Sequence, residues 1–351
     1  MMNDRFMFLG NFICLSKFEK PYFDKFGRPL MKNIFLLLSF LFCVTNTSVL
    51  SQPTSAAANP EIFINVSVMD ARGRAVTGLD KTAFTVNEDK ETAEISSFIS
   101  DEPAEVLFLF DKSKRMSDLY RKADPGKQSL VSHFLSRFMQ SGHPANSYSL
   151  FAFRKTQEQI LATTGNQNNV LAALDALDAL KMEGSTSYLD ACYFGIEKLR
   201  QSTGKKRALI LFTQGGSEQS AYTFKQVNAL LRENNILLYV IAVFEPTSLA
   251  ESGFGGPANM SENYKNQVTK QDEFNKLVTV TGGRVFFPMS ASEMAEIFSR
   301  LGSELQNQYT IGIKLANTSG AGKSRRIKIK IKPPAGTSNL KIRYREEFVI
   351  D

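Results

Sequence analysis

The side chains that could bind a cation or a polar partner begin with Asp111 and Ser113. Both follow the apolar run Val106–Phe110. An apolar run without alternation is typical of a strand that is buried on both faces of a parallel sheet. In open α/β sheets, ligands bind beyond the carboxyl ends of such strands. A carboxylate and a hydroxyl two residues apart therefore predict a binding site at this edge of a sheet.

Two later segments contain further polar side chains. Thr186 lies in a short turn that begins with Gly184 and precedes a helical pattern. Gln214 follows a second buried-strand pattern, Ala208–Phe212. Gln214 thus stands, like Asp111, just beyond a buried-strand pattern.

The order of these segments resembles the metal-ion-dependent adhesion site of von Willebrand factor A domains. The family's first segment reads Asp-x-Ser-x-Ser, and this chain has Asp111, Ser113 and Arg115, so an arginine replaces the final serine. The family's threonine matches Thr186. The family's second aspartate, in a Thr-Asp-Gly turn, is replaced by Gln214. The resemblance implies that the three segments converge in a five-position site, of which three positions are kept.

The two replacements change the chemistry that the site can support. Mg²⁺ requires nearly octahedral coordination by oxygen atoms. Arg115 removes a hydroxyl ligand and adds a permanent cation, and Gln214 removes a negative charge. We therefore predict no cofactor, with Arg115 neutralising Asp111. Mg²⁺ is expected only if the residual positions Asp111, Ser113 and Thr186 still bind it. In the alternative interpretation, Arg115 points to solvent and Asp111 only caps the following segment.

Residues 104–307 alternate between strand and helix patterns. Strands are predicted at Val106–Phe110, Tyr148–Phe153, Ala208–Phe212, Leu237–Val243 and Arg284–Phe287, with Gln159–Ala162 as an edge strand. Apolar residues between them recur at three- and four-residue spacing. This alternation predicts an α/β fold with a mostly parallel sheet and helices on both faces. The order of elements resembles the Rossmann-like von Willebrand A domain. The polar segment Glu245–Lys270 is predicted to be a surface loop.

The flanking segments alternate apolar and polar residues, as half-buried strands do. They are an amino-terminal β unit, 61–103, and carboxyl-terminal strands, 308–351. Neither is long enough for a stable core, so we expect them to join in one accessory sheet domain. The motifs Val66–Asp70, Phe84–Asp89 and Thr281–Phe287 resemble a bacterial secreted family of von Willebrand A-related proteins best known from acidobacteria.

The first sixty residues predict export. Residues 31–51 have a charged start, an apolar run and small residues before Gln52, as in a signal peptide, and 52–60 read as a linker. Translation is then expected to start at Met31, leaving 1–30 as an upstream extension. The protein is predicted to be secreted or periplasmic, with an uncleaved membrane anchor as the alternative. Cys192 is the one cysteine left after cleavage, and we expect a buried apolar residue there.

The sequence offers little for catalysis. His133 and His143 have no cysteine or carboxylate at metal or triad spacing, and no phosphate-binding loop or nucleophile elbow is present. The net charge is +7, but much of it lies in Lys323–Arg345, where basic residues alternate with isoleucine. A solvated strand face explains this pattern. Contact with an anionic surface stays an alternative, and no nucleic-acid partner is expected.

These observations predict an exported, non-enzymatic protein-interaction module. An unknown protein partner in the cell envelope or outside the cell would bind at the strand-end surface. The predicted partner-binding residues are Asp111, Ser113, Arg115, Thr186 and Gln214. The alternative is a structural cell-envelope protein whose accessory sheet makes the contacts, the strand-end site being vestigial.

Overall fold

The central element is a six-stranded sheet in the order β10-β9-β8-β5-β6-β7. The computed structural model describes residues 61–349 except 117–118, 120–128, 155–156, 182–183, 185, 217–219, 245–261, 316–321 and 334–338. The expectations for residues 1–60 lie outside that part. The strands are β5 (Glu105–Asp111), β6 (Ser147–Phe153), β7 (Gln157–Thr164), β8 (Arg207–Thr213), β9 (Leu237–Ala242) and β10 (Arg284–Phe286). All neighbours pair in parallel except β7, which runs antiparallel at the edge.

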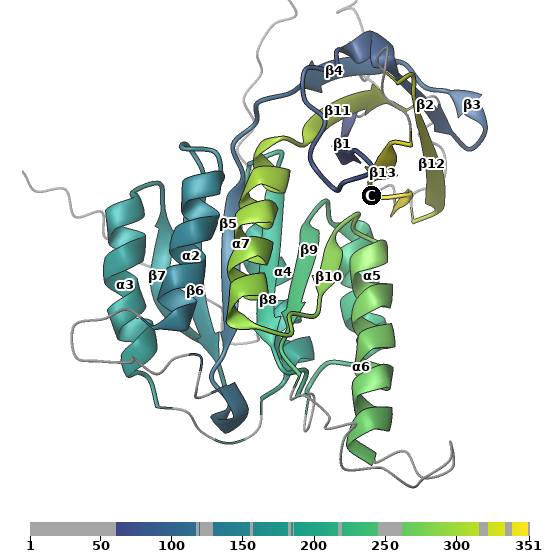
Figure 1. Ribbon diagram of the computed structural model, residues 1–351. Helices are drawn as coiled ribbons and strands as arrows, with labels where there is room; N and C mark the ends of the chain where they lie inside the picture. The colour runs from purple at the N-terminus through teal and green to yellow at the C-terminus, as the bar shows by residue number, and fades with distance from the viewer. Residues whose placement is uncertain are drawn as a thin grey trace, which may run out of the picture. The chain divides into compact units, whose positions relative to one another are not determined.

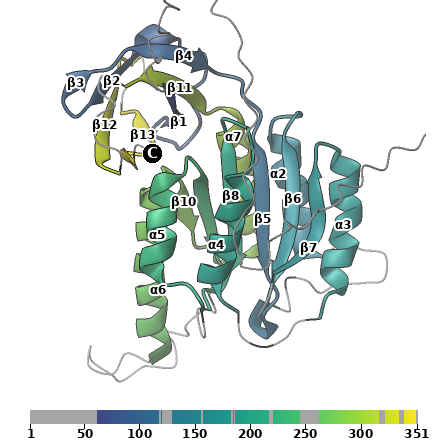
Figure 2. The same ribbon diagram turned by 180° about the vertical axis from the view of Figure 1, so that it is seen from behind.

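Helices cover both faces of this sheet (Figures 1 and 2). Phe108 and Phe110 of β5 pack with α2 (Leu130–Ser141), α3 (Gln167–Ala179) and α7 (Ala291–Gln306). Leu107 and Leu109, which alternate with them, pack with α4 (Tyr188–Leu199), α5 (Phe224–Glu233) and α6 (Glu262–Thr279). A strand whose two faces both meet helices has no solvated side, which explains its unbroken apolar run. The predicted α/β fold, Rossmann-like with helices on both faces, is confirmed.

Helix α6 corrects one prediction. Glu262–Lys270 is helical, although Glu245–Lys270 was expected to form a loop. The carboxyl-terminal half of α6 buries Phe274, Leu277 and Val278 against the sheet. That anchor stabilises the more polar first turns, since helical stability in proteins comes mostly from tertiary packing. In the described part of the chain, no helix is long and apolar enough to cross a membrane.

The flanking segments pair with each other, as predicted, but form two sheets instead of one. The first sheet has the order β13-β1-β11-β4 and the second β14-β12-β2-β3. Their strands are β1 (Glu61–Met69), β2 (Phe84–Glu88), β3 (Glu91–Thr92), β4 (Ile95–Ile99), β11 (Tyr309–Lys314), β12 (Ser324–Ile331), β13 (Lys341–Arg343) and β14 (Glu347–Val349). Apolar residues of both sheets form one core. A single sheet would leave its apolar face uncovered, whereas two sheets cover each other.

A buried polar cluster ties the accessory sheets to the central domain. Glu304 at the end of α7 accepts hydrogen bonds from Ser67 of β1 at 3.2 Å and from Tyr239 of β9 at 2.9 Å. The same carboxylate forms an ion pair with Arg343 of β13. Gln308 donates to the hydroxyls of Ser67 and Tyr239 at 2.8 and 2.9 Å. Charge-assisted bonds of this kind are strong and geometrically specific, so they fix where β1 and β13 meet α7.

Candidate functional site

Asp111 is fixed at the carboxyl end of β5 by hydrogen bonds from two loops. Its side chain is fully buried. Oδ1 accepts the main-chain N–H of Ser113 at 2.8 Å. Oδ2 accepts the hydroxyl of Thr213 at 2.7 Å and the main-chain N–H of Gln214 at 3.2 Å. Because bonds to an ionised acceptor are stronger than neutral ones, Asp111 joins the loop after β5 to the loop after β8.

Thr213 is a site residue that the sequence prediction missed. Its hydroxyl donates to Asp111 and also accepts the main-chain N–H of Gly215 at 2.9 Å. Gly215 has a φ of 84°, a conformation that favours glycine. The sequence did contain a signal for Thr213, because a hydroxyl residue directly follows the second apolar run, Ala208–Phe212. In the structure that run lies in β8, the neighbour of β5.

The loop before α4 contacts the loop after β8 at Gly216. A Cβ atom added there would lie 2.8 Å from the carbonyl oxygen of Thr186 and 2.9 Å from its hydroxyl. The main-chain N–H of Tyr188 donates to the carbonyl of Gly216 at 2.8 Å. The glycine thus permits an approach that a side chain would block. The three predicted segments therefore converge through residues 213–216.

Burial separates the predicted residues into two groups. Asp111, Ser113 and Thr186 are buried, with at most 7% of their surface exposed, so they shape the loops from within. Gln214 is half-buried and reaches the surface. The main chain of Arg115 lies in the short 3-10 helix Lys114–Met116, but its side chain falls outside the described part, as does the predicted neutralisation of Asp111.

Lys112 adds a buried cation beside Asp111. Its Nζ donates to the carbonyl of Leu177, at the end of α3, at 2.9 Å. Burial lowers the pKa of the Lys112 ammonium to about 8, and the carboxylate of Asp178 opposes that shift. Successive strand residues point to opposite faces of a sheet, so Lys112 serves the α3 side and adds no charge to the outer surface.

Helix α6 supports the loop after β8. The Phe274 ring would lie 3.2 Å from a Cβ at Gly215. Next to it, Glu273 accepts the hydroxyl of Tyr188 at 2.7 Å and the ammonium of Lys270 at 2.9 Å. Burial, followed by the bond to Glu273, raises the pKa of Tyr188. These contacts come from Lys270, at the end of the predicted loop segment, and from the residues of α6 that directly follow it.

The histidines show no catalytic arrangement. His133 is exposed on α2. His143 has Nε2 3.1 Å from a carboxylate oxygen of Asp101, and its Nδ1 accepts the main-chain N–H of Ala145 at 3.0 Å. Both ring nitrogens of His143 are thus occupied by structural contacts. Among the described residues, no three His, Cys, Asp or Glu side chains are grouped to hold a metal ion. Cys192 is free and buried, as predicted, and burial raises the pKa of its thiol to about 12.

Comparison with known protein families agrees with this architecture. The family model of the von Willebrand factor type A domain matches residues 105–300, more than half of the chain. No curated protein matches at a significant level.

Similar solved structures share little sequence with this chain. The PilB minor pilin from Streptococcus sanguinis is 14% identical with a TM-score of 0.41, and the match covers 62% of this chain and 64% of the pilin. This chain therefore matches less than two thirds of the pilin's length. A von Willebrand factor type A protein from Catenulispora acidiphila is 11% identical with a TM-score of 0.42, over 84% and 74% of the two chains. BatB from Bacteroides thetaiotaomicron is 15% identical with a TM-score of 0.40, over 57% and 98%.

Proposed function

This chain belongs to the von Willebrand factor type A domain family, and from that premise we propose that it is a non-enzymatic module that binds a protein partner. The contact surface lies at the carboxyl ends of β5 and β8. The observation that carries the proposal is the three-loop junction, in which Asp111 holds two loops and Gly216 admits a third. A surface built on such rigid anchors can present polar side chains in a fixed geometry.

The five positions divide the work of partner binding. Asp111, Ser113 and Thr186 are buried and hold the loops in place. Arg115 and Gln214 carry the partner contacts, with the exposed Lys114 beside them. Arginine suits this role because its planar group makes several directed hydrogen bonds with little loss of entropy per bond.

We propose that partner binding at this site needs no metal. Among the five positions Asp111 is the one carboxylate, and both of its oxygens already accept protein hydrogen bonds. Mg²⁺ holds its ligands in a near-octahedral shell of oxygens, usually with one or two carboxylates. A metal would have to compete with Thr213 and two main-chain N–H groups for a single carboxylate. The residues present therefore fit a degenerate adhesion site, and Thr213 and the main-chain donors satisfy Asp111 in place of a cation.

The predicted export signal and the resemblance of the family motifs extend the proposal to location. We propose a secreted or periplasmic protein related to the acidobacterial von Willebrand A-related family, released by cleavage near Gln52. The pattern of residues 31–51 supports this, with an uncleaved anchor as the alternative. Intact mass of the exported protein decides between them, because a retained apolar segment adds about twenty residues.

The rival function is a structural envelope protein that makes its contacts through the accessory sheets. One observation favours it: the outer face of β12 presents Arg326, Lys328 and Lys330 beside Lys90, with a hollow of about 600 Å³. The isoleucines between them, Ile327 and Ile329, are buried as predicted. Such a basic face attracts anionic surfaces. The rival function therefore includes the contact with an anionic surface that was an alternative prediction from the sequence.

Two matched double variants separate these functions. Arg115→Ala with Gln214→Ala alters the strand-end surface, and Lys328→Ala with Lys330→Ala alters the basic face; both leave the buried anchors intact. Each protein is immobilised and incubated with a cell-envelope extract, after thermal melts have established that it is folded. We expect the first variant to lose the captured partner at least tenfold and the second to retain it. The opposite result establishes the rival, and capture that both variants retain refutes the proposed surface.

A further inference from the structure

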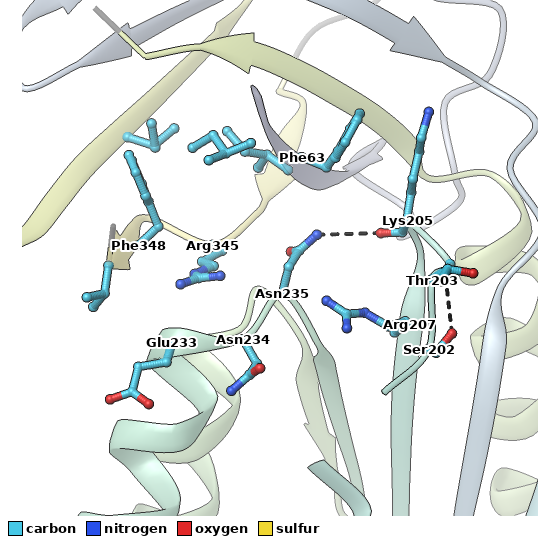
Figure 3. A pocket seen from close by; sticks show the side chains of 15 residues that line it. Phe63, Ser202, Thr203, Lys205, Arg207, Glu233, Asn234, Asn235, Arg345 and Phe348 are labelled. Carbon is cyan, nitrogen blue, oxygen red and sulfur yellow. Dashed lines mark hydrogen bonds between the residues drawn. The ribbon is translucent and has the colours of Figure 1, made fainter. Parts of the chain in front are cut away.

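A cavity of about 440 Å³ lies where the accessory sheets meet the central domain (Figure 3). Arg207 of its lining begins β8, whereas Thr213 of the strand-end site ends β8. At the usual rise of a strand these positions are about 20 Å apart. The cavity is therefore separate from the proposed partner-binding surface. Its volume falls in the range of small-molecule sites, which runs from about 300 to 1,000 Å³.

The cavity has one apolar wall and one polar wall. The accessory sheets supply aromatic and aliphatic side chains, among them Phe63, Ile327 and Phe348. The start of β8, with the turn before it, and the turn before β9 supply polar groups, including Arg207 and Asn235. A site that combines apolar surface with directed polar groups binds a molecule that has both characters.

The charge of the side chains that line the cavity favours an anion. Lys205, Arg207 and Arg345 line the cavity, against a single carboxylate, that of Glu233. In Figure 3 the Glu233 carboxylate points away from the two arginines. The guanidinium of Arg345 is held in place by the carbonyl oxygens of Glu347 and Arg232. An arginine fixed in this way presents its charge without losing side-chain entropy on binding.

Arg207 is the strongest candidate to contact the ligand. Its Nη1 donates to the carbonyl of Leu199 at 3.2 Å, while its Nε is buried and has no hydrogen-bond partner among the described residues. Glu105, paired across the strands, is the carboxylate that acts on its charge. A buried donor without an acceptor is unfavourable, so a small shift toward an anionic oxygen would satisfy this guanidinium.

We propose that the cavity binds a small organic monocarboxylate with an apolar or aromatic body. The carboxylate faces Arg207, with the amide of Asn235 nearby, and the body packs on Phe63 and Phe348. The planar arginine fork matches a carboxylate better than a neutral amide. Lys205 already lies 4.6 Å above the Phe63 ring, so cation and aromatic wall meet at one end of the cavity.

Isothermal titration calorimetry of the full chain tests this proposal with two isosteric probes. The probes are 3-phenylpropionate and its neutral amide, 3-phenylpropanamide. We expect the acid to bind at least tenfold more tightly than the amide. Arg207→Met should weaken acid binding at least tenfold. Arg200→Met is the matched control, because Arg200 pairs with Glu197 at 3.2 Å, outside the lining, and its loss removes an equal charge.

Three outcomes overturn the proposal: no binding of the acid, equal affinity for acid and amide, or unchanged affinity in Arg207→Met. If Arg207→Met does not fold, Thr203→Trp decides, because Thr203 is an exposed residue of the lining and an indole there fills the cavity. Acid binding that survives Thr203→Trp places the ligand elsewhere and refutes the proposal. Loss of binding in that variant supports it.

Discussion

Replacing Thr213 by valine tests the anchor beneath the strand-end surface. Valine has nearly the shape of threonine, so packing at this fully buried position is kept. The change removes the 2.7 Å bond to Asp111 and the acceptor for the Gly215 N–H at 2.9 Å. A buried group left without its partner costs about 1 to 3 kcal/mol, and charged groups cost more. Asp111 keeps two main-chain donors, so we expect unfolding free energy to fall by roughly 2 to 4 kcal/mol.

Urea denaturation followed by circular dichroism measures this loss, and an unchanged slope shows that the change lies in stability. Thr310→Val is the control, because Thr310 is equally buried but makes a neutral bond to Asn65 at 3.0 Å. That control should lose about 1 kcal/mol. If Thr213→Val loses no more than the control, the hydroxyl does not anchor Asp111 and the reasoning fails.

Three further changes test other parts of the structure. Arg115→Ser with Gln214→Asp restores the family's ligand set, so Mg²⁺ should raise the melting temperature of this variant. At a hundredfold excess of Mg²⁺ over Kd, the stabilisation of the folded state is about 2.7 kcal/mol. A rise in the unmodified protein contradicts the metal-free site. Gly283→Ala places a Cβ well inside van der Waals distance of the carbonyl oxygen of Leu238 and should cost about 3 kcal/mol, so an unchanged thermal melt refutes that close approach. Burial lowers the pKa of Lys206 from 10.5 to about 8, so the folded state releases its proton first and stability rises with pH between those values. Lys206→Met should lack that rise. The unfolding free energy of the unmodified protein minus that of the variant should therefore increase by roughly 1 kcal/mol per pH unit between about pH 8 and about pH 10. If this difference stays constant with pH, the Lys206 ammonium is not destabilised by burial.

The central fold could be predicted because its signals are local. Unbroken apolar runs such as Val106–Phe110 mark strands that are buried on both faces, and they stand where the structure has β5 and its neighbours. The first segment of the site, with Asp111 and Ser113, followed from the same fact, since ligands bind beyond the carboxyl ends of such strands. The other two segments followed from the family resemblance. Thr213 was not predicted because a hydroxyl at the end of a strand can bind many different groups. Only the register of β8 against β5 shows that this hydroxyl lies beside Asp111.

The remaining differences arise from long-range contacts. The first half of α6 is polar, and its helical state depends on Phe274 and its neighbours packing against the sheet. Each flanking segment shows which of its own faces is apolar, but not its partner strand. Pairing of β1 with β11 and of β2 with β12 divides the strands between two sheets, and no local pattern encodes that division.

The pairing of β1 with β11 also sets an order of events during synthesis. About 240 residues separate Met69 from Tyr309, where the partner strand begins. At a ribosomal rate of about 5 to 20 residues per second, β1 waits roughly 12 to 48 s for its neighbour. The six-stranded sheet uses strands between residues 105 and 286, so it can form first. During that interval Ile64, Val66 and Val68 belong to a strand without its partner, so a segment that is synthesised early is covered late and is open to non-native strand pairing.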